Sequence, residues 1–223
     1  MASTTNASAS APTRLSLFRP LLLILYATGF AFETVLESVR THHPERLAGV
    51  AAFKKAWFAR FWAWLGPRNR EGAARHVLPL LRKARGVCLD VGPGTGEWLD
   101  LYARAQNPLI SKVYGIEPNH ELHAKLEASA RRAGLSEIYE IIGCGVEELS
   151  LRPELVGIDV DTIITIQCLC SVPTPRKVIS ELYRLLKPEG QWLVYEHVRT
   201  KYRGHFVDYW QREYILFPVY CSC

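Results

Sequence analysis

The alternation of apolar and polar positions gives the back part of the chain a regular pattern. From Arg70 onward, short apolar runs alternate with segments of helical periodicity. Strands that alternate with helices pair in parallel and build a sheet that helices cover on both faces. The pattern therefore predicts a Rossmann-like, doubly wound α/β fold with a parallel sheet. The expected strands are 87–91, 112–117, 139–144, 162–167 and 191–197.

Helices are expected at 70–84, 97–105, 120–133 and 174–186. Asn119 is a favoured N-cap and Gly134 a favoured residue after a helix, so both ends of 120–133 are marked. Thr174 is expected to cap the last helix, with Pro175 at its first position. Pro79 is expected to kink the first helix, and the run Lys187–Gly190 predicts a turn before the last strand.

The front part of the chain has a different pattern. Residues 1–13 are rich in Ala, Ser and Thr and show no periodicity, so they are expected to be disordered. The apolar run 21–32 follows a basic flank and is shorter than the ~20 residues that a spanning helix needs. A signal peptide and a transit peptide remain alternatives, but no small-residue cleavage site follows and the run is uniformly apolar. A membrane anchor within one leaflet fits best.

An aromatic-rich segment, 47–66, follows the apolar run. Phe53, Trp57, Phe61 and Trp64 fall on one helical stripe, and lysine and arginine residues lie between them. Such helices lie at membrane surfaces, because aromatic rings and long cationic side chains suit the headgroup region. A lid helix packed on the rest of the protein is the alternative. We therefore expect three regions: a tail and anchor (1–45), a helical lead-in (46–84) and an α/β domain (85–223).

Composition and charge narrow the function. The net charge of +5 comes from scattered residues, so nucleic-acid binding is not indicated. The six cysteines form no CxxC pair and have no zinc-ligand spacing with histidine, so no metal site is expected. Nothing in the sequence indicates an oligomeric state.

A glycine-rich turn follows the first predicted strand. Gly92, Gly94 and Gly96 allow positive φ and let a ligand approach the backbone, as in nucleoside-binding turns. Their GxGxG spacing differs from the GxGxxG of dinucleotide-binding turns, so a Rossmann-type oxidoreductase is a less favoured alternative. Glu117 ends the second strand, where a carboxylate can accept hydrogen bonds from ribose hydroxyls. Asp90 could orient the loop or bind an ammonium group. The alternatives are that Glu117 is a solvated surface side chain and that Asp90 only caps the turn.

Several motifs resemble those of class I S-adenosylmethionine (SAM)-dependent methyltransferases, in the same order. These are LDVGPGTGEW, YGIEPN, GCGVEEL, TIQCLCSV and ELYRLLKPEGQWLVYEHV. They are most similar to the methyltransferase type 11 group. Within that group, CLCSV, YEHV and FVDYWQREY resemble membrane-associated thiol methyltransferase-like proteins. The resemblance covers about residues 50–220 and implies SAM as cofactor.

The resemblance also implies roles for single residues. The three glycines would surround the methionine and ribose of SAM, with Asp90 behind them and Glu117 on the ribose. Val146 and Glu147 match the adenine contact, although this chain has Gly-Val-Glu where Asp-Ala is commoner. Gln167 begins the wall near the methyl group, which extends to Ser171.

Methyl transfer from a sulfonium is an in-line displacement, so a base is needed only if the acceptor must lose a proton. Glu196 and His197 end the last strand and are the candidates, with a purely structural role equally open. The acceptor is expected to be small and lipophilic. The subgroup implies a thiol, and a quinone- or lipid-like molecule is the rival. A membrane surface is the expected partner, on the cytosolic face of the endoplasmic reticulum or of lipid droplets.

The C-terminal part is shorter than the resemblance implies. Class I sheets normally have two more strands after the fifth. Here only the 26 residues 198–223 follow the fifth predicted strand, and 204–217 has a helical pattern. We therefore expect the last two strands to be missing. Strand 191–197, with Trp192, Val194 and Tyr195, would then form an apolar edge that invites self-association. A truncated form that binds SAM but is catalytically impaired is the alternative function.

Overall fold

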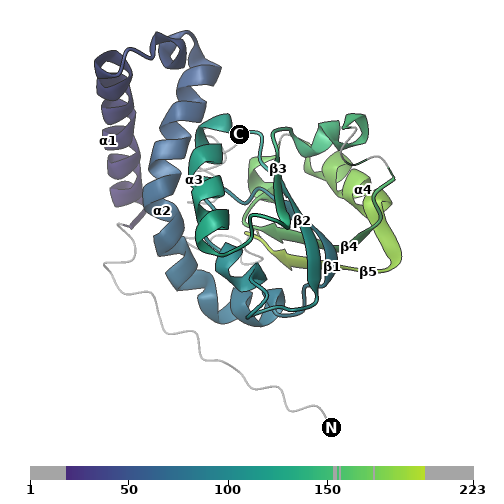
Figure 1. Cartoon of the computed structure of the whole chain (residues 1–223). Coiled ribbons are helices and arrows are strands. Elements are labelled where there is room, and N and C mark those ends of the chain that lie inside the picture. The colour runs from purple at the N-terminus through teal and green to yellow at the C-terminus, as the bar shows by residue number, and fades with distance from the viewer. Residues whose placement is uncertain (1–18, 153–154, 156, 173, 199–223) are drawn as a thin grey trace, which may run out of the picture. The chain divides into compact units, whose positions relative to one another are not determined.

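The computed structural model describes residues 19–198 except 153, 154, 156 and 173 (Figure 1). The chain divides into two compact units, one up to Phe53 and one from Lys54 onward. The predicted disordered tail 1–13 and the predicted helix 204–217 lie outside the described residues. So does any strand that would follow the fifth.

The first unit holds α1 (Arg19–Arg40) and the short 3-10 helix η2 (Pro44–Leu47). The part of α1 from Leu21 to Arg40 is long and apolar enough to cross a membrane, judged by length and composition. The apolar run 21–32 is therefore the first part of a longer helix, and its role as a membrane anchor stays a prediction. In the part of α1 beyond the apolar run, the Thr34 and Ser38 hydroxyls donate to backbone carbonyls four residues earlier, both at 2.7 Å, so these buried polar groups are satisfied within the helix.

Helix α2 (Val50–Leu81) is one continuous helix of 32 residues where two were expected. It includes Pro67 and Pro79, and from Lys54 it belongs to the second unit. Its C-terminal half is anchored in the core, since Ala73 and Leu81 are 3% and 0% exposed.

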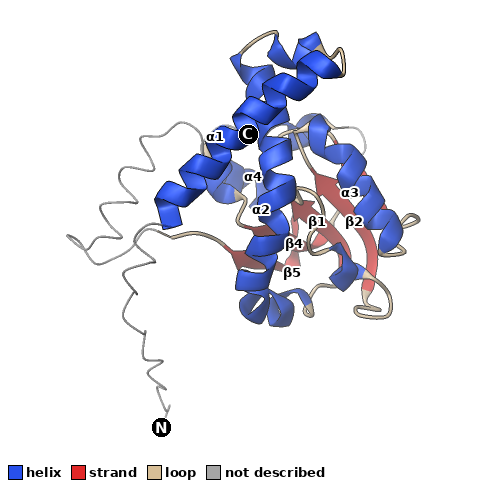
Figure 2. Ribbon diagram, turned by 90° about the vertical axis from the view of Figure 1, so that its left-hand side faces the viewer, coloured by secondary structure: helices blue, strands red, loops and turns tan. Residues whose placement is uncertain are grey.

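The second unit is built on five parallel strands in the order β3-β2-β1-β4-β5, which confirms the predicted doubly wound α/β fold. Helices α2 and α3 lie on one side of the sheet and α4 on the other (Figure 1; Figure 2). The strands are β1 (Gly86–Val91), β2 (Ile110–Ile116), β3 (Tyr139–Ile142), β4 (Val160–Ile166) and β5 (Leu186–Tyr195). The helices are α3 (His120–Arg132) and α4 (Pro175–Leu185), with 3-10 turns η3 (Leu99–Tyr102), η4 (Val146–Leu151) and η6 (Leu169–Ser171).

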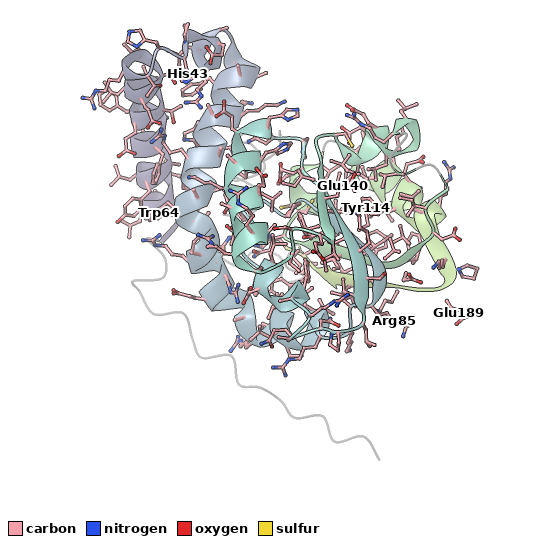
Figure 3. All side chains as sticks on the ribbon, in the orientation of Figure 1. His43, Trp64, Arg85, Tyr114, Glu140 and Glu189 are labelled. Atoms are coloured by element: carbon pink, nitrogen blue, oxygen red, sulfur yellow. The ribbon has the colours of Figure 1, made fainter. Side chains whose placement is uncertain are left out.

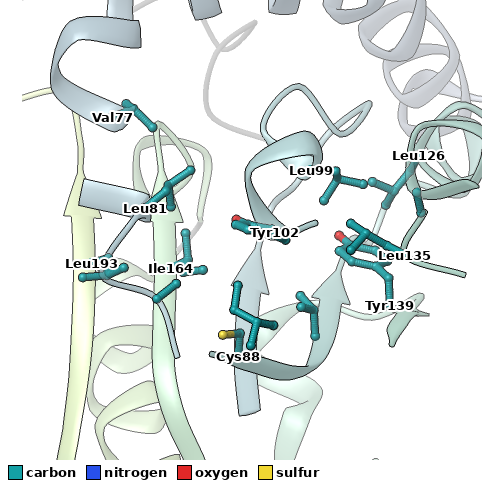
Figure 4. Packing of buried hydrophobic residues seen from close by; sticks show 14 of the residues in the cluster. Val77, Leu81, Cys88, Leu99, Tyr102, Leu126, Leu135, Tyr139, Ile164 and Leu193 are labelled. Atoms are coloured by element: carbon teal, nitrogen blue, oxygen red, sulfur yellow. The ribbon is translucent and has the colours of Figure 1, made fainter. Parts of the chain in front are cut away.

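Two apolar clusters fill the two faces of the sheet. One joins Val77 and Leu81 of α2 to Leu126 of α3 across Cys88 and Ile164 (Figure 4). The other joins the opposite face to α4 and η4. Because both faces are covered, the strands read as nearly continuous apolar runs, and this is why the sequence pattern located them.

The helix caps and the glycine after α3 agree with the sequence in part. Asn119 Oδ1 accepts the N–H of Glu121 at 3.2 Å, and Gly134 has a φ of +70°. Thr174, however, makes no side-chain capping bond to α4.

The predicted helix 97–105 is wrong. Turns and the single 3-10 turn η3 occupy this stretch. Leu99 and Tyr102, each 1% exposed, are three residues apart, and a 3-10 helix places residues at that spacing on one face.

Strand β5 starts at Leu186, directly after α4, and contains the predicted turn 187–190 as an outward bulge. Leu186 pairs with Val160 and Gln191 pairs with Thr162, so four residues of β5 face a single residue of β4. The guanidinium of Arg85 donates to the Glu189 carbonyl at 3.3 Å (Figure 3). The strand ends at Tyr195, so the two residues predicted to end it follow it instead.

Candidate cofactor site

A hollow lies at the carboxyl ends of β1 and β4. Strand order reverses there, and open α/β sheets bind ligands at such a point. Asp90 lines it from β1, Gly92 and Gln167 from directly after β1 and β4, and Trp62 and Arg70 from α2. The remaining lining residues are Gly66, Asn69, Val91, Pro93, Gly96, Glu97, Trp98, Leu99 and Ile166.

The glycine turn is required by conformation and by space. Gly92, Gly94 and Gly96 have φ values of +67°, +62° and +82°. A Cβ on Gly92 would overlap the Cys168 thiol, and one on Gly94 would overlap the indole nitrogen of Trp62. The turn is therefore packed from two sides, as well as bent in a way that L-residues rarely adopt.

Glu117 follows β2 and supports the glycine turn. Its Oε2 accepts the N–H of Gly94 at 3.1 Å, and its Oε1 accepts the N–H of Asn119 at 2.9 Å. Burial raises the pKa of Glu117 to about 7, against the lowering effect of these two amides. A carboxylate has about four acceptor positions, so each oxygen keeps one beyond these two bonds. Glu117 is not among the residues that line the hollow, and its ribose role stays a prediction.

Asp90 is held by tyrosines. Tyr139 donates to its Oδ2 at 3.3 Å, and the Tyr102 hydroxyl also bonds to this carboxyl. A side chain on Gly115 would overlap the Tyr139 hydroxyl, so this glycine gives the tyrosine its path to Asp90. Burial raises the pKa of Asp90 to about 7. The two tyrosines thus fix the Asp90 side chain at the end of β1.

Helix α2 supplies two site residues that the sequence did not indicate. The Trp62 indole N–H is buried beside the Glu97 carboxyl, and its hydrogen bonding opposes the rise in the pKa of Glu97 that burial causes. Arg70 donates to the Glu97 carbonyl and, through both Nη atoms, to Asp100 at 2.5 and 2.7 Å. The predicted aromatic stripe lies on another face of the helix, where the rings of Trp57, Phe61 and Trp64 stack on one another. Residues within 62–70 line the hollow, which is consistent with the alternative of a helix packed on the rest of the protein.

The two residues predicted to contact adenine do not line the hollow. Val146 is 6% exposed and packs in the apolar cluster of η4. Glu147 is exposed and turns its carboxylate toward Gly145. Their role stays a prediction.

The loop after β4 meets the end of β5 beside the hollow. Gln167, with a φ of +54°, places its amide nitrogen 3.2 Å from His197 Nε2. The other ring nitrogen of His197 lies 3.9 Å from the Cys170 sulfur. The structure therefore brings Gln167 and His197 together, as the predicted site requires.

Glu196 holds this loop. Its Oε1 accepts the N–H groups of Cys168 and Leu169, both at 3.1 Å, while its Oε2 is buried without a partner among the described residues. Burial raises the pKa of the carboxyl. One oxygen of Glu196 thus has a structural role in this loop. The described residues contain no cluster of three or more potential metal-ligating side chains.

Known proteins match this fold and site. A model of a methyltransferase domain family matches residues 61–218. A phosphatidylethanolamine N-methyltransferase of Cereibacter sphaeroides is 31% identical over 59% of this chain and 57% of its own. A thiol S-methyltransferase of Rattus norvegicus is 28% identical over 71% of this chain and 64% of its own. The chain thus spans less than two thirds of either relative.

A solved structure agrees in fold. An O-methyltransferase family protein from Burkholderia thailandensis aligns with a TM-score of 0.52 and 17% identity, over 85% of this chain and 59% of that one. The strand order and the glycine turn define a class I methyltransferase fold. The chain belongs to the methyltransferase domain family, and its predicted kinship with SAM-dependent methyltransferases is confirmed.

Proposed function

We propose that this protein transfers the methyl group of SAM to a small, lipophilic acceptor. The observation that carries the proposal is the pairing of the glycine turn with Glu117 at the switch point of the sheet. Two features suit SAM: a turn with three glycines at positive φ, and a carboxylate that keeps acceptor positions beyond its two bonds to backbone N–H groups. SAM, when bound, supplies the activated methyl.

In this proposal, the chain holds SAM with Glu117 on the ribose hydroxyls and with Gly92, Gly94 and Gly96 around the ribose and methionine. Asp90 and its tyrosines fix the end of β1 beneath the turn. Val146 and Glu147 remain the proposed adenine contacts. Gln167 would form part of the wall near the methyl group, because it lines the hollow from the end of β4.

The acceptor would bind on the side of Glu196 and His197. A thiol must lose its proton to become a good nucleophile, and an imidazole or a carboxylate of raised pKa can take it at neutral pH. Both groups lie on the loop that follows β5, next to Gln167 and Cys168. A thiol is favoured by the rat relative, and a phospholipid amine by the bacterial one.

Membrane association is part of the proposal. Helix α1 has the length and composition of a spanning helix, and Leu25, Phe32 and Val39 are 64–68% exposed. Its hydroxyl groups are satisfied by carbonyls of the same helix, which lipid requires of buried polar groups. A signal sequence near an N-terminus has the same features. We propose that α1 is an anchor, with the site on the cytosolic face of the endoplasmic reticulum or of lipid droplets.

SAM binding without turnover is the second candidate. It is favoured because Glu196, one of the two predicted bases, is buried and bonded to the N–H groups of Cys168 and Leu169, which is a structural role. Single-turnover assays distinguish the two candidates, since a binding protein would retain SAM and release no methylated product.

The cofactor proposal is tested by isothermal titration of the full chain with SAM and S-adenosylhomocysteine. Glu117→Gln should weaken binding at least about tenfold, because a neutral amide presents fewer acceptors to the ribose and to the two backbone N–H groups. Glu127→Gln, at an exposed ion pair on α3, is the matched control and should bind normally. Absence of heat with wild-type protein would end the proposal.

The acceptor proposal is tested with SAM labelled on its methyl group and vesicles that contain either a lipophilic thiol or phosphatidylethanolamine. Transfer to the thiol should fall about 10²-fold or more in His197→Ala or Glu196→Gln, the usual contribution of a general base. If both variants transferred the methyl group as fast as the wild-type protein, neither residue would act as the base. For the anchor, Leu25→Arg with Phe32→Arg should reduce co-sedimentation with vesicles.

A further inference from the structure

Helices α2 and α3 lie side by side (Figure 1), and a groove of about 580 Å³ lies between them and the end of the glycine turn. Ligand pockets measure roughly 300–1,000 Å³, so the groove has the size of a binding site. It shares Arg70, Gly96 and Glu97 with the cofactor hollow, but none of the described residues that line it lies in a strand. The groove is therefore on the helical side of the turn, away from the strand ends.

The groove exists because small side chains face one another where α2 passes α3. Ala63 and Pro67 line it from α2, while Ala128 and the C-cap Ala133 line it from α3. Neighbouring helix axes are usually about 8–10 Å apart, and interlocking side chains fill the space between them. Side chains as short as those of alanine and proline leave part of this space open.

Three cations and two acids line the groove, and both acids already have partners. Asp100 accepts from Arg70 through both carboxylate oxygens, at 2.5 and 2.7 Å. The Glu97 carboxylate accepts the Thr95 hydroxyl, and burial raises its pKa, which makes it a weaker anion. The acids therefore leave the two cations of α3 without a counter-charge in the groove.

These two cations, Lys125 and Arg132, are exposed on one wall of the groove. Their spacing of seven residues places them on the same face of α3, about 10 Å apart along its axis. Their long side chains can therefore reach one ligand that lies between them. Among the residues that the structure describes, neither is in an ion pair, whereas the neighbouring Arg131 is paired with Glu127.

Two hydrogen bonds hold Arg132 in place beside the turn. Its Nη2 donates to Ser129 Oγ at 2.9 Å, and the Ser129 hydroxyl donates to the Thr95 carbonyl at 2.8 Å. A guanidinium has five N–H donors, so most of them remain for a ligand. A side chain that is already positioned loses less freedom when it binds, and this favours binding at Arg132.

We propose that the groove binds a molecule with a dianionic phosphate group, which Lys125 and Arg132 hold while the short side chains of α2 and α3 enclose the rest. A phosphate monoester has a charge of about −2 at neutral pH and three acceptor oxygens, which match two cations without a counter-charge. A guanidinium can bind it through two parallel N–H groups. The phosphate belongs either to a lipid headgroup or to a water-soluble ester. The site does not depend on the proposed function.

Calorimetric titration of the full chain with glycerol phosphate tests the site. Wild-type protein should bind it, and Lys125→Gln with Arg132→Gln should raise the dissociation constant at least about tenfold, because two charged donors are lost. Arg131→Gln with Lys112→Gln removes the same charge outside the groove and should bind as wild type. No binding by wild-type protein, or equal weakening in both double variants, would overturn the site.

Ala128→Phe tests the groove, because it places a large ring between the two cations and leaves their charges unchanged. The dissociation constant for glycerol phosphate should rise at least about tenfold. Ala124→Phe, at an exposed position of α3 that does not line the groove, is the matched control and should bind as wild type. Urea unfolding checks that both variants fold. Unchanged affinity in Ala128→Phe would overturn the groove as the binding site.

A short-chain phosphatidic acid distinguishes the two sources of the phosphate. Binding at least about tenfold tighter than that of glycerol phosphate, in wild type but not in Lys125→Gln with Arg132→Gln, would identify a lipid headgroup. Equal affinity would identify a water-soluble ester, and both results support the phosphate site.

Saturating SAM should leave the affinity for glycerol phosphate unchanged. Competition between the two would place the phosphate in the cofactor hollow and overturn a separate site. Failure of wild-type protein to bind SAM would instead overturn the proposed function, and the direct titrations with glycerol phosphate would still test the groove.

Discussion

The Oε2 atom of Glu117 accepts the backbone N–H of Gly94 at 3.1 Å, which ties the end of β2 to the turn that follows β1. The two residues are 23 positions apart in the chain. The bond uses the carboxylate to shape the turn before any ligand arrives, so the same group can hold the turn and bind a ribose.

Gly94→Ala should weaken SAM binding at least about tenfold and should destabilise the fold more than Gly134→Ala. Both glycines have positive φ, +62° and +70°, so both substitutions carry the backbone cost of about 1–2 kcal/mol. Only at Gly94 would the new Cβ meet a neighbour, the Trp62 ring, whereas nothing lies within 4 Å at Gly134. Urea unfolding and calorimetry measure both effects. Equal losses of stability would mean that the Trp62 contact is unimportant.

Asp90→Asn should flatten the pH dependence of stability between about pH 4 and pH 7. The pKa of Asp90 is raised from 3.8 to about 7 by burial, so the folded state binds a proton that the unfolded state has released. The stability from this carboxyl is present below the unfolded pKa and is lost as pH rises towards 7, at up to about 1.4 kcal/mol per pH unit. Urea unfolding at several pH values measures the slope.

Asp161→Asn gives the contrasting result. The Lys187 ammonium and the Val87 N–H lower the pKa of Asp161, so its contribution is present at neutral pH and is lost as pH falls through the folded pKa. The variant should therefore lose stability at neutral pH and little in acid. Parallel slopes in the Asp90 and Asp161 variants would contradict both assignments.

Tyr139→Phe should destabilise the protein by about 1 kcal/mol, and more at pH 8 than at pH 5. The Tyr139 hydroxyl donates to Asp90 and lowers the pKa of that carboxyl, so its loss matters most when Asp90 is ionised. Tyr183→Phe, at a ring that is 60% exposed on α4, is the control and should have almost no effect. A loss independent of pH would indicate packing in place of the hydrogen bond.

Cys170 should react with a thiol reagent before Cys88 and Cys144 do. Cys170 is exposed and lies 3.9 Å from His197, whereas the other two are buried and burial raises the pKa of Cys88 to about 12. Mass spectrometry after brief labelling identifies the modified residue. In His197→Phe the rate at Cys170 should fall several-fold, because the reactive thiolate loses its N–H partner. Labelling of Cys88 first would contradict the burial found here.

The hydrophobic pattern predicted most of the fold, because a sheet covered on both faces needs strands that are apolar nearly throughout. All five strands were found within a few residues, and so was the helix between Asn119 and Gly134. The stretch 97–105 was predicted as a helix, but it forms turns and a single 3-10 turn in which Leu99 and Tyr102 are buried.

The sequence also predicted the two ends of the Glu117–Gly94 bond, since glycines after one strand and an acid after the next fall at one edge of a parallel sheet. It could not predict Trp62, Arg70 or Tyr139 as parts of the site. Each reaches the site from another element, and the paths depend on where helix α2 crosses the turn and on the space that Gly115 leaves.

The sequence by itself thus determined the class of fold, the glycine turn after the first strand and the acid after the second, because these follow from local conformation and from the order of the strands. Only the tertiary structure decided which side chains pack over the turn, which tyrosines bond to Asp90 and which groups meet beside Gln167. Those contacts join residues that are 27 to 49 positions apart, and no local pattern records such distances.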